Sequence, residues 1–273
     1  IHLRPGGGVC DSPATGIGDD DYHEIGVIER SVSTPVVRVT SMTNANTVNA
    51  LPDILELPES LVNQVGEDCV NDAREYVWTQ IVRGEDDVEE LVNDFIEGYE
   101  LEPSAATSAV VAEFISRAMT IRRQQIAALK KAGFSGKSNL TLAFEKLQQQ
   151  GVLALEDFSC CNNCGHDEAT ELMNEDSNRW QAYVFFHEQD TERLIETGET
   201  CLRFYCNHRH ICSAEEWQTL DRAQKEALLD KRLQELFVMV LVPTFAEYGM
   251  TVEWNGDVQS CMMLKNAFFF RNL

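Results

Sequence analysis

The fold is decided at residues 151–158, GVLALEDF, where the spacing of apolar residues changes. Before this stretch apolar side chains recur every three to four residues, as at Ala73, Val77 and Ile81, which is typical of helices packed on a core. From Val152 onward, short apolar runs of strand length replace that period. The sequence therefore predicts an α+β fold, with N-terminal helices followed by a sheet.

Five short segments beyond residue 151 have the composition of strands. They are 152–158, 182–187, 202–206, 251–254 and 262–265. Residues 255–257, Asn-Gly-Asp, provide a hairpin turn between the last two, so we expect a mostly antiparallel sheet. Residues 213–249 read as a long C-terminal helix that packs on this sheet and breaks at Pro243.

We divide the chain into three parts by composition. Residues 1–58 are rich in Gly, Pro, Ser, Thr and Asn and form an arm or small subdomain, in which residues 35–40 could make an edge strand. Residues 68–136 form a helical region. Residues 137–273 form an α+β region that contains the Cys-rich string.

The charge balance limits the kinds of partner. The chain has 22 basic and 45 acidic residues among 273, a formal net charge of -23, which repels nucleic acid phosphates and anionic lipids. We therefore expect no nucleic acid partner, and a basic protein is the favoured partner class. The alternative is that the charge only keeps the protein soluble. The longest apolar run, 236–246, is too short to span a bilayer and contains Pro243, so we expect no membrane partner either.

The most distinctive string is residues 157–166, DFSCCNNCGH. Cys161 and Cys164 have the two-residue gap that lets two thiolates reach one tetrahedral zinc, and the following Gly would permit a tight turn. Cys206 and His208 could complete the ligand set, although about forty residues separate the two halves. Nine cysteines is an odd number, and their clustering favours a reducing cytoplasm over a disulfide framework.

The same thiols allow two other interpretations. Cys160 and Cys161 could pack at the end of a strand without any chemistry, because free Cys is often a core residue. Alternatively, Cys161 and Cys164 could form a reversible disulfide. Acidic surroundings would raise the pKa of these thiols and so oppose high reactivity.

A second string, residues 183–192, YVFFHEQDTE, places polar groups at the end of an apolar strand. His187 could act as a base that Glu188 or Asp190 orients, with Cys161 as the nucleophile. The acidic residues could instead begin a helix by capping it.

Three groups of residues together resemble a known family. They are 73–78, AREYVW; the Cys string with the YVFFHEQDTE string; and 251–256, TVEWNG. They resemble an uncharacterised bacterial family described only as a domain of unknown function, over roughly residues 68–265. The resemblance implies a common fold and a common site built from these strings, but no activity. Residues before 68 and the segment 206–212 look like additions to the pattern.

Two function hypotheses follow. The first is an acidic interaction protein, of the inhibitor or immunity type, whose surface neutralises a basic protein target. The alternative is a zinc-binding or thiol-dependent enzyme centred on Cys161, Cys164 and His187.

Overall fold

The computed structural model describes residues 48–258 and 260–273, and all of them belong to one compact unit. The expected edge strand at 35–40, and all but the last residues of the predicted arm, lie outside the described residues. Within the described part of the chain, no helix combines the length and the apolar character needed to cross a bilayer.

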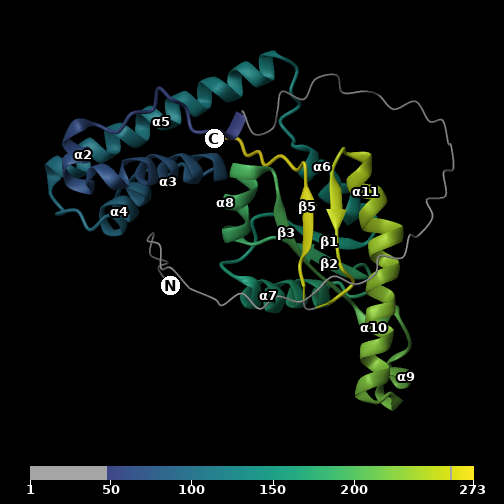
Figure 1. The fold of residues 1–273 in the computed structure, drawn as a ribbon. Helices are drawn as coiled ribbons and strands as arrows, with labels where there is room; N and C mark the ends of the chain where they lie inside the picture. Colours follow the sequence, from purple (N-terminus) through teal and green to yellow (C-terminus); the bar gives the residue numbers. More distant parts are fainter. Residues whose placement is uncertain (1–47, 259) are drawn as a thin grey trace, which may run out of the picture. The chain divides into compact units, whose positions relative to one another are not determined.

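The first described elements are helices, as expected (Figure 1). They are α2 (Glu59–Val65), the short 3-10 helix η1 (Glu67–Cys69), α3 (Val70–Arg83), α4 (Val88–Gly98) and α5 (Ala105–Lys131). The apolar period predicted their inner faces correctly, because Ala73, Val77 and Ile81 are buried in the main core. Capping residues fix the helix starts: the side chain of Ser104 accepts the Thr107 N–H at the start of α5.

A five-stranded mixed sheet follows, which confirms the α+β class. Its strands are β1 (Val152–Leu155), β2 (Ala182–Phe185), β3 (Thr200–Cys206), β4 (Thr251–Glu253) and β5 (Met262–Lys265), in the order β1-β2-β3-β5-β4. The β1–β2 pair is parallel, and the other pairs are antiparallel. A parallel pair needs a crossover, which here contains α7 (Asn162–Glu175). The C-terminal ends of β1 and β2 therefore lie side by side at the same end of the sheet.

The two faces of the sheet pack against different elements. Val184 of β2 faces the main core, which also contains Phe144 of α6 (Asn139–Gln149). Tyr183 and Phe185 face a smaller core with Ala169 of α7. Strand side chains alternate between faces, so α7 covers the face that carries every second residue of β2.

The C-terminal helical segment is divided more than expected. It consists of α9 (Ala214–Thr219), α10 (Arg222–Leu236), a π-helical turn η3 (Phe237–Leu241) and α11 (Val242–Glu247). The first division arises because Asp221 and Gln224 form a capping box that starts α10 anew. Pro243 does not end the helix; it lies in the first turn of α11, where its missing N–H costs least, directly after the π-helical turn. α8 (Glu188–Thr197) and the 3-10 helix η2 (His208–His210) complete the fold.

A buried polar clamp joins the helical layer to the C-terminal segment. Asn49 donates from Nδ2 to the Phe269 carbonyl at 2.8 Å and accepts, at its own carbonyl, the Trp78 indole N–H at 2.7 Å. Arg122 of α5 donates to Asn49 Oδ1 and to the Val48 carbonyl. Asn49 is buried and its polar groups are paired, so it fixes three separate segments to one another.

Candidate functional site

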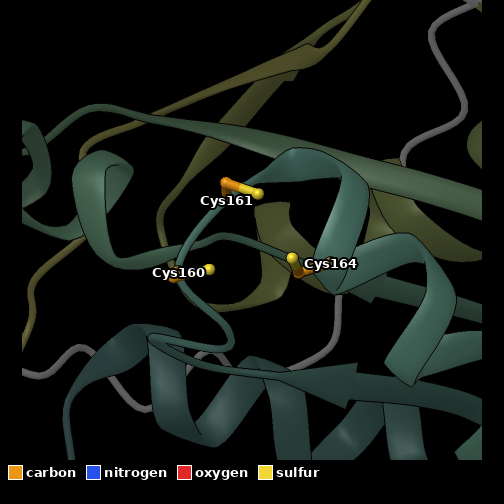
Figure 2. A group of neighbouring side chains, drawn as sticks. All are labelled: Cys160, Cys161 and Cys164. Atoms are coloured by element: carbon orange, nitrogen blue, oxygen red, sulfur yellow. The ribbon is translucent and has the colours of Figure 1, made fainter. Parts of the chain in front are cut away.

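Three thiols converge at the end of β1. The sulfur atoms of Cys160, Cys161 and Cys164 all lie within 4.8 Å of one another. Cys160 and Cys161 belong to the loop after β1, and Cys164 belongs to the first turn of α7 (Figure 2). All three cysteines are free and at least partly exposed. A group of this kind could hold a metal ion.

The loop that carries these thiols, residues 156–161, is fixed by backbone geometry. Asp157 and Ser159 have positive φ angles of 51° and 66°, so the chain reverses sharply after β1. The Phe158 N–H donates to the Phe186 carbonyl at 2.9 Å, and the Glu188 N–H donates to the Ser159 carbonyl at 3.2 Å. The parallel pairing of β1 and β2 brings these two chain segments to the same end of the sheet, and the hydrogen bonds then hold the loop there.

Asp157 anchors the loop through contacts of its carboxylate with other segments of the chain. Its side chain is only 5% exposed, and its Oδ1 lies 3.1 Å from Arg83 Nη2 at the end of α3. Thr191 of α8 donates its hydroxyl to the same oxygen at 2.6 Å, and Arg271 lies 3.6 Å from the other oxygen. A nearly buried carboxylate requires such partners, so the loop is joined to three other segments of the chain.

Gly165 has a different role from the one that we predicted. We expected it to permit a tight turn, but it is a helical residue of α7. A Cβ at this position would overlap the ring of Phe185 on β2. Gly165 therefore lets the first turn of α7 lie directly against the sheet, which places Cys164 near the loop.

The two thiols at the start of α7 differ in acidity. Cys161 is the N-cap residue, and its pKa is lowered mainly by the backbone N–H of Cys164, although its sulfur does not close a capping hydrogen bond by geometry. The side chain of Cys161 in turn raises the pKa of Cys164 to about 11. The acidic composition therefore did not decide the acidity of Cys161, because a helix N-terminus favours a local negative charge.

Arg203 lies beside the thiol group, on the face of β3 that α7 covers. Its Nε donates to Asn162 Oδ1, at the first residue of α7, at 2.8 Å. Its Nη1 is buried and has no hydrogen-bond partner among the described residues. The same guanidinium faces the thiol of Cys261, and together with His187 it opposes the rise that burial causes in the pKa of Asp190. Arg203 thus positions the start of α7.

The predicted catalytic residues directly follow β2, at the same end of the sheet as the thiol-bearing loop. His187 is 6% exposed, and its Nε2 is 3.1 Å from Asp190 Oδ2, without the alignment of a hydrogen bond. Burial raises the pKa of Asp190. Glu188 points to Arg83 instead, with 3.7 Å between the charged atoms. The structure brings His187 and Asp190 together, and among the described residues His187 Nδ1 and Asp190 Oδ2 are buried without a hydrogen-bond partner.

Cys206 and His208, the other half of the predicted ligand set, are not brought to the thiol group. The antiparallel register pairs Cys206 with Ala182, the first residue of β2, whereas the thiol-bearing loop follows Leu155, the last residue of β1, which pairs with Phe185, the last residue of β2. Cys206 is fully buried, and burial raises its pKa to about 12. The His208 ring stacks on Trp217 at a centroid distance of 4.8 Å. These two residues therefore lie at the opposite end of the sheet from the thiol-bearing loop.

Sequence reasoning missed two residues that shape the site. Arg203 gave a weak signal, as a charge in the middle of an apolar strand. Asp157 stood inside the string that we quoted, but nothing in sequence placed Arg83 against it. Cys160 entered the sequence interpretation only as a residue that could pack at the end of a strand, and the structure places its sulfur with those of Cys161 and Cys164.

The chain was compared with known families, curated proteins and solved structures. A family model described as "Domain of unknown function (DUF6891)" matches residues 66–272. The matched range continues through residues 206–212, which had looked like an addition. No curated protein and no solved structure matches the chain.

Proposed function

The chain belongs to the DUF6891 family, whose description assigns no activity, and we propose from its own residues that it is a zinc-binding protein. Cys160, Cys161 and Cys164 supply three thiolate ligands, and the fourth coordination position is open to water or to a substrate. The observation that carries this proposal is the approach of the three sulfur atoms to within 4.8 Å of one another.

The distances support tetrahedral coordination. Zinc–sulfur bonds of about 2.3 Å at tetrahedral angles separate the sulfur atoms by about 3.8 Å. Side-chain rotations of exposed cysteines are sufficient to close the remaining gap, because such rotations are fast and cost little. Zinc also requires thiolates, and the lowered pKa of Cys161 favours the first of them.

The open position distinguishes this site from a closed structural zinc site. No His, Asp or Glu within the described part of the chain joins the three sulfur atoms. Catalytic zinc sites keep three protein ligands and one exchangeable position, whereas structural sites use four protein ligands. His187 and Asp190, at the same end of the sheet, are the candidate proton-transfer pair for a substrate bound there. Reduced thiolate ligands agree with the reducing cytoplasm that we propose as the location.

The test measures metal content and then coordination. We expect about one zinc per chain by plasma mass spectrometry for the reduced, tag-free protein. Cys161→Ser should lose the metal, and Cys206→Ser, the matched control on β3, should keep it. Cobalt(II) in place of zinc should give the absorption of a tetrahedral thiolate site, and a change in this spectrum on adding imidazole would report the open position.

A folded, fully reduced protein that takes up neither zinc nor cobalt would exclude a metal at this site. Circular dichroism of Cys161→Ser separates loss of ligand from loss of fold. An unchanged cobalt spectrum with imidazole would show a closed site and exclude the open position.

The second candidate function is the acidic interaction protein, which the formal charge of -23 supports. A surface with such an excess of carboxylates attracts a basic protein at long range and loses that attraction as salt is added. Retention of a basic partner at low salt and its release at high salt would support this role. Equal retention at both salt concentrations would contradict it.

A further inference from the structure

A second pair of thiols lies on the sheet, apart from the three at the start of α7. Cys201 lies on β3, directly opposite Met263 of β5. Cys261 is two residues before Met263, so its side chain projects from the same face of the sheet as Cys201. Cys261 precedes the first paired residue of β5, and the ladder therefore does not hold its backbone.

The side chains of Cys201 and Cys261 are in contact. Burial first, and a hydrogen bond with the Cys261 thiol second, raise the pKa of Cys201, and Arg203, two residues along β3, is hydrogen-bonded to both thiols. Both cysteines are half-buried and free. A disulfide requires Cα atoms about 4.4–6.8 Å apart, and the segment before β5, which the ladder does not hold, is the part that can move to meet this requirement.

We propose that Cys201 and Cys261 are a redox-active dithiol, which a low-molecular-weight disulfide converts into a disulfide that links β3 to the start of β5. The Cys261 thiolate attacks one sulfur of the small disulfide, and the small thiolate leaves. Cys201 then loses its proton, its thiolate attacks the Cys261 sulfur, and the second small thiolate leaves. Two protein thiols are oxidised, and one small disulfide is reduced to two small thiols.

The order of the two steps follows from the surroundings of Cys201. Burial, and next the contact with Cys261, raise the pKa of Cys201 to about 11, so Cys201 is protonated at neutral pH and is the poorer first nucleophile. Once Cys261 is in the mixed disulfide, it no longer raises the pKa of Cys201. Arg203 remains beside both sulfur atoms and stabilises the thiolate that forms.

The experiment uses the full chain without substitutions. The reduced protein is incubated with oxidised glutathione, the remaining thiols are alkylated in acid, and the digest is mapped by mass spectrometry. We expect a cross-linked peptide that contains Cys201 and Cys261, and its return to two free thiols after treatment with reduced glutathione. Oxidised protein in which both residues stay free, or carry separate glutathione adducts, would overturn the proposal.

Two single variants test the order of attack. Cys201→Ser should retain glutathione on Cys261 as a stable mixed disulfide, because no second thiol displaces it. Cys261→Ser should leave Cys201 unmodified. Cys206→Ser, on the same strand but buried on the other face, should still form the link. A variant in which Cys160, Cys161 and Cys164 are all Ser should form it too, and loss of the link there would contradict a separate dithiol.

Discussion

Two Cys-rich segments of this chain look alike in sequence and differ in the structure. In the loop before α7, three sulfur atoms lie within 4.8 Å of one another. In the segment 206–212, each side chain has its own neighbour instead: Cys206 contacts the Leu229 carbonyl, His208 stacks on Trp217, and His210 contacts the Ser177 carbonyl. Metal-like spacing is therefore not sufficient for a site.

The difference between the segments lies in what holds them. The loop before α7 is anchored through Asp157 below and Asn162 beside it, so that its thiols are left free to face one another. In the second segment the buried side chain of Asn207 donates to backbone carbonyls and holds the chain by its polar groups. Removing the anchors of the first segment should make it resemble the second.

Removal of the Asp157 carboxylate should have the largest effect. Asp157→Ala leaves Arg83 without its nearly buried partner, and we expect the free energy of unfolding to fall by about 3 kcal/mol, with loss of zinc. Chemical denaturation and metal analysis measure both effects. Asp157→Asn tolerates the positive φ and isolates the charge, and Asp86→Ala, at an exposed position, should change neither quantity. Unchanged zinc binding in Asp157→Ala would mean that the anchor does not shape the site.

Replacement of Arg203 should have an intermediate effect. Arg203→Lys loses the fixed Nε contact to Asn162, and we expect zinc affinity to fall by about 10-fold, because groups that orient ligands typically contribute that much. Competition with a chromophoric chelator measures the affinity. Arg209→Lys, in the second segment, is the matched control and should leave zinc affinity unchanged. Equal effects of the two substitutions would contradict a positioning role for Arg203.

The smallest expected effect is on the pH dependence of the free energy of unfolding. Glu156, beside the thiol-bearing loop, and Glu216, just after the segment 206–212, should contribute to it with opposite sign. Burial raises the pKa of Glu156, at the foot of the loop, so its contribution to stability is full below the ordinary Glu pKa and is lost as pH rises through the folded value. Hydrogen bonds from Ser213 lower the pKa of Glu216, so its contribution is present above the ordinary pKa and is lost as pH falls through the folded value.

Gln substitutions separate the two trends. Relative to the unmodified protein, Glu156→Gln should gain stability as pH rises from acid to neutral, and Glu216→Gln should lose it over the same change. Urea denaturation at a series of pH values measures both. Parallel trends in the two variants would refute the assignment of burial as the dominant influence on Glu156.

The sequence predicted what depends on local pattern. Helical periodicity identified the buried face of α3, and apolar runs located all five strands. The antiparallel β4–β5 pair agrees with the hairpin expected between the last two strands, but the sequence could not predict the other strand pairs, because these depend on contacts between distant segments. The antiparallel register of β2 and β3 places Cys206 at the far end of the sheet, and for that reason the predicted four-ligand set is divided. Arg203 joined the site for the same long-range reason, whereas Cys160 lies next to Cys161 in the chain and joined it through the local geometry of the loop.

The clamp at Asn49 has a consequence for the order in which the chain folds. Asn49 and the Phe269 carbonyl are 220 residues apart, so the partner that pairs Asn49 leaves the ribosome 220 residues after Asn49 itself. Until then, the helices that contain Trp78 and Arg122 can associate, but one of their shared polar groups lacks its final partner. Closure of the helical layer should therefore wait until residue 269 has left the ribosome. A stalled chain that ends before residue 269 should remain sensitive to proteolysis at this layer.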